Sequence, residues 1–160
     1  MAISPNDDFT AGQVLTASEQ NRFPRGIMGY ATSSTTYTLT LTETITTGMT
    51  VTFDAVAGRL YKLTYYEPAV FTPSVVSGQT TLGIRLTNAT GTLVQRGYVE
   101  TGVAVKINGT VGVLDLYAAG TSGSVTIVGT SFASSLTGAP TIDRTLLIPA
   151  FISVEDIGIN

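Results

Sequence analysis

The sequence predicts an all-β protein, an antiparallel β-sandwich or jelly roll that follows a short N-terminal arm with one helix. Short runs rich in threonine, valine, tyrosine and isoleucine recur along the chain, and these residue types suit strands. Turn signals containing glycine or asparagine separate the runs at intervals typical of sandwiches and barrels. Of the 160 residues, 43% are hydrophobic and 12% are charged, which supports a buried core. We therefore expect an arm over residues 1–29 and a sandwich over residues 30–160.

The arm carries the only helix signal in the sequence. Thr16 and Glu19 fit a capping box, in which each side chain accepts a hydrogen bond from the backbone N–H of the other residue. Pro24 restricts Phe23 to extended backbone and so ends the helix. A helix over residues 17–22 is too short to be stable alone in water, so we expect it to dock on this chain or a neighbouring copy. The candidate contact residues of this assembly arm are Phe9, Val14, Leu15, Thr16, Glu19 and Phe23.

The strand signals then follow one another along the chain. Residues 38–42 and 49–53 alternate with a period of two, as expected of half-buried strands. Further predicted strands cover residues 59–66, 81–87, 93–100, 103–107, 110–117, 124–132 and 146–155. Predicted turns lie at residues 57–58, 88–91, 108–109 and 120–123, and Asn108-Gly109 predicts a hairpin. The last predicted strand is strongly apolar, which favours a central position in its sheet.

The composition excludes several classes of function. Histidine and cysteine are both absent, so a Ser-His-Asp triad, thiol catalysis and thiolate metal sites are excluded. The net charge of −3 disfavours nucleic-acid binding. No phosphate-binding loop, dinucleotide fingerprint or metal-binding pair is present, so we expect no cofactor. The acidic first eight residues indicate no export signal, and Pro149 interrupts the longest apolar run, so we expect no membrane span.

Carboxylates are the remaining candidates for catalysis. A pair of them could support glycoside hydrolysis if the two faced each other across a substrate. Acidic residues on strands usually lie on the solvated face, so we expect that the protein is not an enzyme. The candidates for this alternative are Asp54, Glu67, Glu100, Asp115 and Asp143.

Three segments together resemble a family of known proteins. The first is residues 9–17 with Asn21 and residues 24–27, the second is residues 51–63, and the third is residues 149–158. They are similar to segments of small virion accessory proteins of tailed bacteriophages, a group that includes capsid decoration proteins, head fibres and minor tail appendages. The segments lie near both ends and in the middle, so the resemblance spans the chain.

This resemblance implies a body like the jelly roll of tumour necrosis factor, which usually forms a homotrimer. The candidate trimer interface includes Tyr65 or Tyr66, Tyr117 and Phe151; alternation places one of the two adjacent tyrosines inward and the other outward. The implied function is that of a non-enzymatic structural protein on the exterior of a phage, as capsid decoration or head fibre. It would be assembled in the host cytoplasm, with phage capsid or tail proteins as partners.

One alternative stays open within the same family. A minor tail or receptor-binding appendage would use exposed loops, for which residues 73–79 and 133–143 are candidates, to touch a host surface receptor.

Overall fold

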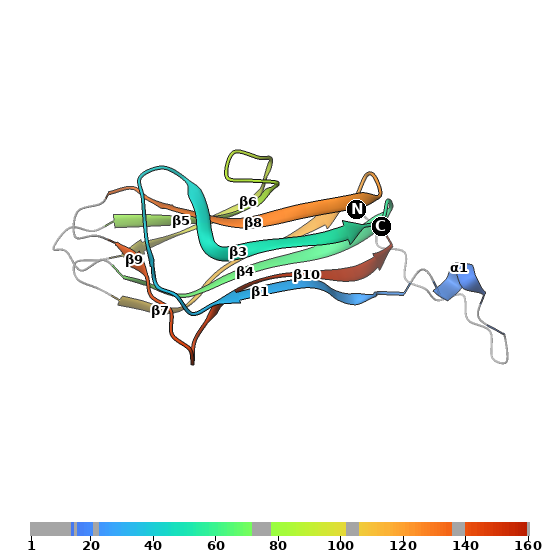
Figure 1. Cartoon of the computed structure of the whole chain (residues 1–160), viewed down its shortest axis with the longest axis horizontal. Helices are drawn as coiled ribbons and strands as arrows, with labels where there is room; N and C mark the ends of the chain where they lie inside the picture. The colour runs from blue at the N-terminus through green and yellow to red at the C-terminus, as the bar shows by residue number, and fades with distance from the viewer. Residues whose placement is uncertain are drawn as a thin grey trace.

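The computed structural model describes residues 14, 16–20, 23–71, 78–101, 106–135 and 140–159, leaving aside the side chains of residues 18, 19, 101 and 106–111. Two antiparallel sheets pack face to face (Figure 1), which confirms the predicted all-β sandwich. The helix α1 (Ala17–Gln20) is a single turn within the described residues, and the rest of the predicted helix, residues 21–22, lies outside them. No helix in the described ranges is long and apolar enough to cross a bilayer.

The two sheets, here called sheet A and sheet B, differ in their strands. Sheet A contains, in spatial order, β1 (Gly26–Ser33), β10 (Ala150–Ile159), β4 (Arg59–Phe71) and β7 (Lys106–Ala118). Two short strands, β9 (Thr141–Ile142) and β2 (Tyr37–Thr38), extend sheet A beyond the end of β10. Sheet B contains β3 (Thr44–Ala55), β8 (Gly123–Ala133), β5 (Gly78–Leu86) and β6 (Leu93–Thr101).

The order of the long strands is that of a jelly roll. When the eight long strands are numbered along the chain, sheet A reads 1-8-3-6 and sheet B reads 2-7-4-5. This interleaving of two Greek keys defines the jelly roll. The last strand is central, between β1 and β4, as predicted, but it begins at Ala150 and residues 146–148 lie outside it. Pro149 lacks the N–H that a ladder position needs, which explains why the strand begins after it.

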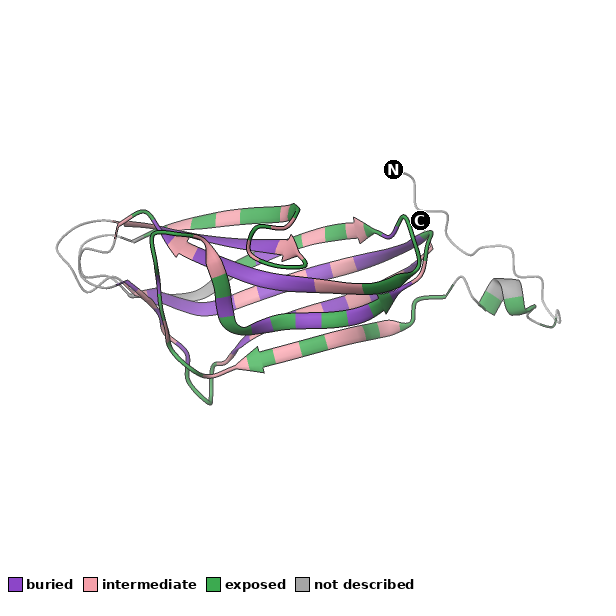
Figure 2. Ribbon diagram, turned by 45° about the horizontal axis from the view of Figure 1, so that its top comes forward, coloured by how far each residue is buried: buried purple, intermediate pink, exposed green. Residues whose placement is uncertain are grey.

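The core lies between the two sheets. Buried and more exposed residues alternate along β3 and β10, so each of these strands turns one face inward (Figure 2). At the centre, Tyr65 is fully buried beside Gly129, where an added Cβ would lie 2.9 Å from the tyrosine ring. The largest fully buried apolar side chains are Tyr61, Tyr65, Leu39, Met49, Leu63, Leu82, Ile84, Ile127, Ile142, Ile152 and Val70.

The predicted hairpin at Asn108-Gly109 is wrong. Both residues lie inside β7, which runs without a turn from Lys106 to Ala118. The register between β4 and β7 shifts there, because Glu67 pairs with Val111 and Ala69 pairs with Asn108. Pro68 lies opposite this shift and cannot donate to the ladder, so the Asn-Gly signal marks a β-bulge.

The other predicted turns are confirmed. Residues 57–58 connect β3 to β4, with Gly58 at a φ of 78°, and residues 120–122 connect β7 to β8. Asn88 forms the turn between β5 and β6 by accepting bonds from the N–H and hydroxyl of Thr90. The sandwich begins at Gly26, which pairs with Asp156, four residues before the predicted boundary.

Candidate assembly surface

The face of sheet A that points away from sheet B carries a cluster of apolar side chains. Ile152 and Val154 are buried between the sheets, so the alternating residues Phe151 and Ser153 point outward. The strand registers place Tyr66 beside Phe151 and Tyr30 beside Ser153 on that same outer side. We call the cluster the outer apolar face; it comprises Ile27, Tyr30, Tyr66, Leu114, Leu116 and Phe151.

A row of three aromatic rings crosses this face from β1 to β4. The centroid of Phe151 lies 5.9 Å from that of Tyr30 and 5.3 Å from that of Tyr66, with interplanar angles of 23° and 24°. These are offset-stacked pairs, each of which stabilises its strand pairing by about 0.5–1.5 kcal/mol beyond burial. The two tyrosines thus cover the ring of Phe151 within one chain, while Tyr30 itself is 57% exposed.

The described charged side chains on this face form an ion pair. The register places Lys62 and Glu155 on it, and the Lys62 ammonium donates to the Glu155 carboxylate at 3.0 Å. Leu114 and Leu116 on β7 add apolar surface beside this pair. Among the described side chains of this face, these two charges balance each other, so two copies could approach through this region without charge repulsion.

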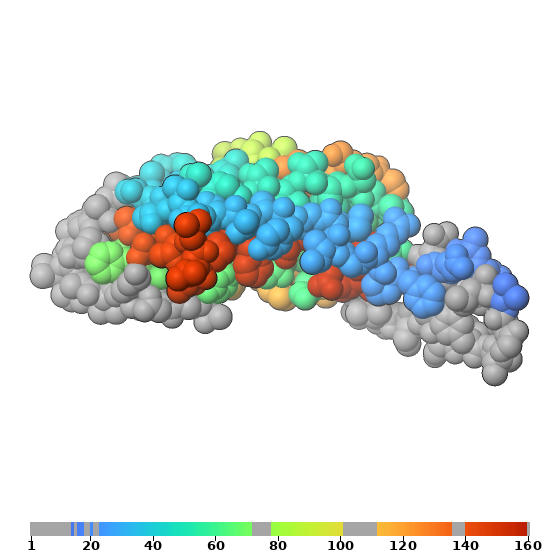
Figure 3. Space-filling model, turned by 60° about the horizontal axis from the view of Figure 1, so that its bottom comes forward, coloured from blue at the N-terminus to red at the C-terminus, as the bar shows by residue number. Residues whose placement is uncertain are grey.

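A loop with an apolar tip projects from the sheet A side between β9 and β10. We call residues 145–148 the finger; Leu146 is 88% exposed and Leu147 is 93% exposed. Thr145 and Ile148 close the finger by two backbone hydrogen bonds of 3.2 Å, and the Thr145 hydroxyl accepts a further bond from the Ile148 N–H. Figure 3 shows it in orange-red on the face turned to the viewer, beside the blue residues of β1.

The base of the finger is anchored in the core by Arg144. Its guanidinium donates two bonds to the Glu67 carboxylate, from Nε at 2.9 Å and from Nη2 at 2.5 Å. It also donates to the backbone carbonyls of Thr47 and Thr35, at 2.9 and 3.3 Å. Both charged side chains are inaccessible to solvent. The finger is therefore fixed to β3, to β4 and to the segment after β1.

Burial changes the ionisation of the groups around this anchor. Loss of solvent raises the pKa of Glu67, although the hydrogen bonds and charge of Arg144 oppose this change. Burial and the nearby Glu67 carboxylate also raise the pKa of Tyr65 well above its ordinary value. The Tyr65 hydroxyl therefore stays protonated and donates to Glu67 Oε1 at 2.5 Å.

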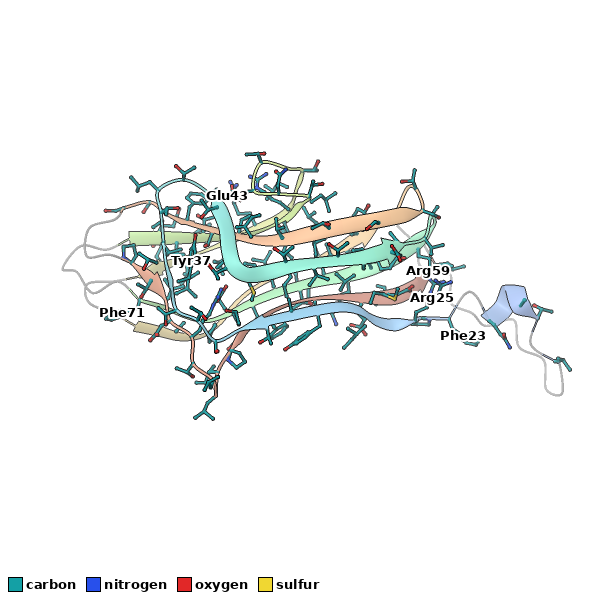
Figure 4. The ribbon with its side chains drawn as sticks, in the orientation of Figure 1. Phe23, Arg25, Tyr37, Glu43, Arg59 and Phe71 are labelled. Atoms are coloured by element: carbon teal, nitrogen blue, oxygen red, sulfur yellow. The ribbon has the colours of Figure 1, made fainter. Side chains whose placement is uncertain are left out.

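A second buried ion pair fixes the point where the arm meets the sandwich. Arg59 donates to both carboxylate oxygens of Asp156, at 2.5 and 2.7 Å. The same guanidinium donates to the backbone carbonyl of Phe23 at 2.5 Å. Figure 4 labels Phe23, Arg25 and Arg59 at this end of the sandwich, and Figure 1 shows α1 beyond it. Phe23 is thus held in place at this end of the sandwich.

The predicted assembly-arm residues are only partly described. Val14 is 85% exposed, Thr16 is exposed, and Phe23 is 38% exposed. Thr16 accepts a backbone bond from Gln20 at 3.0 Å, which closes α1. Phe9, Leu15 and the side chain of Glu19 lie outside the described residues, so the capping box stays a prediction.

The predicted interface residues separate into two pairs. Tyr66 and Phe151 lie on the outer apolar face, whereas Tyr65 is enclosed in the core and Tyr117 packs against Tyr61 on the inner side. Tyr65 is thus the inward member of its pair. On the outer side of sheet A, the exposed apolar residues that sequence reasoning missed are Ile27, Tyr30, Leu114, Leu116 and the finger. From the sequence alone, the alternation of Leu114, Asp115 and Leu116 suggests that the two leucines face the core. The strand register shows instead that they face outward and that Asp115 faces inward, opposite Leu63.

An ion-pair network lies on the outer face of sheet B. Arg85 donates two bonds of 2.7 and 2.8 Å to the carboxylate of Glu43, and Arg96 donates a third at 2.7 Å. The Thr130 hydroxyl donates a fourth at 2.6 Å. The hydrogen bond from Arg85 is the main reason that the pKa of Glu43 is lowered from 4.5. This network joins β5, β6 and β8 to the segment before β3.

The five candidate catalytic carboxylates lie on different elements. Asp54, Glu100 and Asp115 lie on β3, β6 and β7, and Asp143 accepts a bond of 3.3 Å from the Thr36 hydroxyl. Glu67 is enclosed by its pairing with Arg144. Asp115 pairs with Leu63, four residues from Glu67, a separation of about 13 Å that exceeds the spacing in glycosidases. Among the described residues, no group of three acidic side chains could hold a metal.

The comparisons with known proteins assign no family. No family model matches the chain, and no curated protein matches it. A solved xylanase 10B from Clostridium thermocellum, containing CBM22-1 and GH10 modules with xylohexaose, is similar over 85% of this chain and 29% of its own, at 11% identity and a TM-score of 0.39. An arabinose-bound GH51 α-L-arabinofuranosidase is similar over 95% and 26%, at 11% identity and a TM-score of 0.34.

A third solved structure is an isolated module. The CBM22-1 xylan-binding domain of Paenibacillus barcinonensis Xyn10C is similar over 82% of this chain and 88% of its own, at 8% identity and a TM-score of 0.33. The chain thus spans less than a third of the two enzyme structures and most of this module. All three TM-scores are below 0.5, and the likeness assigns no function to this chain.

Proposed function

We propose that this protein is a non-enzymatic structural protein that assembles as a homotrimer through its outer apolar face and is displayed on the exterior of a tailed-phage particle. The observation that carries the proposal is the exposed apolar surface of sheet A, with the row Tyr30, Phe151 and Tyr66 at its centre. Monomeric proteins rarely expose large contiguous apolar patches, which usually mark contacts with other proteins.

The composition of the surface supports contact between copies. Aromatic residues are enriched, and charged residues depleted, at the centres of protein interfaces. On this face the charged pair Lys62 and Glu155 is already satisfied within one chain. The leucines on β7 are 55% and 46% exposed, so their complete burial would contribute about 1 kcal/mol each. A stable trimer needs each interface to bury more than about 1,000 Å².

The placement on a phage is supported by the resemblance of three segments to virion accessory proteins. The second segment, residues 51–63, spans β3 to β4 with the turn at Gly58, and the third forms most of β10. The bonds of Arg59 to Asp156 and to the Phe23 carbonyl hold the start of the arm against these two strands. An anchored arm and an outward-facing body suit a decoration protein or head fibre.

Purified particles test this function. Quantitative mass spectrometry of virions should detect the protein in stoichiometric amounts, and antibody labelling should place it on the outer surface. Hundreds of copies would indicate shell decoration or head fibres, whereas a handful would indicate a minor tail or receptor-binding appendage. Absence of the protein from particles that carry its gene would contradict a virion role.

A further inference from the structure

We propose that the finger of one copy packs against Leu114 and Leu116 on β7 of the neighbouring copy. This inference rests on the proposed trimer and adds to it a specific, directional contact. It assigns the finger to a second copy of this chain.

The finger has the properties of a preorganised contact. Its two leucines are almost fully exposed, yet its base is held by Arg144, whose guanidinium donates to Glu67 and to two backbone carbonyls. Its tip is closed by paired hydrogen bonds between Thr145 and Ile148. A loop already fixed in one shape loses little conformational entropy when it binds, which favours association.

The finger leaves the sheet at a distance from Leu116 on β7 of its own chain. Its C-terminal end leads into Ala150, whose strand partner is Ser33 on β1. Leu116 pairs with Lys62, and Lys62 pairs with Glu155, which is four residues beyond Phe151. The leucine is therefore about 13 Å further along the strands and about 10 Å across them.

The two apolar patches lie towards opposite edges of sheet A. The base of the finger borders β1, the first strand of the sheet, whereas Leu114 and Leu116 lie on β7, beyond β4. An interface that joins two different patches is heterologous, and such interfaces close into rings when the rotation permits. In the proposed homotrimer, the contact between a finger and the β7 of the next copy would repeat around the three-fold axis.

The chemistry of the two patches also matches. The finger contributes Leu146, Leu147 and Ile148, and the partner patch contributes leucines of β7 that are 55% and 46% exposed. Neither of these sets contains a charged side chain. Their contact would bury apolar surface on both sides and leave the charged pair Lys62–Glu155 in place.

Engineered disulfides test the contact, since the chain contains no cysteine. Leu147→Cys and Leu116→Cys are placed in separate chains with different tags, co-expressed and oxidised. The expected result is a covalent pair containing both tags, because only a contact between copies brings the two sulfurs within disulfide range. Thr50→Cys, at an exposed position of β3 in sheet B, replaces Leu116→Cys as the matched control and should give no mixed pair.

Sedimentation of the unmodified protein distinguishes a failure of the proposed trimer from a failure of the finger contact alone. A trimer in which no mixed disulfide forms, or in which Leu147→Cys links only to itself, would overturn the finger contact and leave the trimer standing. A monomer would overturn both. As an independent readout, Leu147→Asp should weaken trimer formation at least tenfold without changing the circular dichroism of the fold, and unchanged assembly would contradict the inference.

Discussion

Arg144 and Glu67 form a bidentate ion pair in the interior of the sandwich, with both side chains inaccessible to solvent. Arg144 belongs to the connection between β9 and β10, and Glu67 belongs to β4, so the pair joins an irregular segment to a central strand. Together, the two bonds from Arg144 and one bond from the Tyr65 hydroxyl satisfy the hydrogen-bonding capacity of the buried Glu67 carboxylate. The pair thus anchors the base of the finger to β4, one of the strands that carry the outer apolar face.

Removing one partner of this pair should be strongly destabilising. Arg144→Met leaves the Glu67 carboxylate buried without its cation, which typically costs about 3–5 kcal/mol. The double variant Arg144→Met with Glu67→Gln removes both charges and should recover part of that loss. Urea denaturation measures the free energies of unfolding. A loss below about 1 kcal/mol in the single variant would show that the pair does not hold the segment.

Gly129 should not tolerate a methyl group. A Cβ there would lie 2.9 Å from both Met49 Cβ and the Tyr65 ring, so Gly129→Ala forces the core to shift at a cost of about 1–3 kcal/mol. Gly120→Ala is the matched control, since a Cβ there meets nothing within 4 Å. Thermal unfolding should show a lower Tm for Gly129→Ala alone. Equal Tm values for the two variants would contradict this packing.

The contribution of Glu43 to stability should depend on pH. Because the folded-state pKa of Glu43 is below its ordinary value of 4.5, ionisation stabilises the fold above pH 4.5. That stabilisation is lost as the pH falls through the folded-state pKa. Glu43→Gln should therefore cost about 1 kcal/mol at pH 7 and less at pH 3, as measured by urea denaturation. A cost that does not change between these pH values would contradict the ionised network.

Removal of residues 1–22 should leave the fold stable but prevent the chain from attaching to the particle. The truncated chain keeps the bond of Arg59 to the Phe23 carbonyl and the whole of β1, so its Tm should stay within about 2 °C of the full chain. Incorporation into particles, measured by mass spectrometry of purified virions, should be lost. Normal incorporation would contradict the anchoring role of the arm.

The fold class was predictable because alternation and turn chemistry are local properties. Residues 49–53 alternate in the sequence and form part of β3, and the turn at Gly58 needs the positive φ that glycine permits. Asn108-Gly109 misled the prediction because its role depends on Pro68 of the neighbouring strand. Pairing between distant segments decides whether such a signal forms a turn or a bulge.

The candidate surface was less predictable, because it depends on which face of each strand turns outward. Phe151 and Tyr66 could be proposed from the sequence, but their stacking follows from the register between β10 and β4. Leu146 and Leu147 belong to a strongly apolar run that predicts a strand. Their exposure follows from the anchoring of Arg144 and the position of Pro149, which only the three-dimensional structure reveals.

Sedimentation velocity of the purified protein at micromolar concentration is the most direct test of the central claim that the outer apolar face joins copies of this chain. We expect one species with three times the mass of the chain, which Leu116→Asp converts to monomers while Thr50→Asp does not. A wild-type protein that sediments as a monomer at this concentration would contradict it.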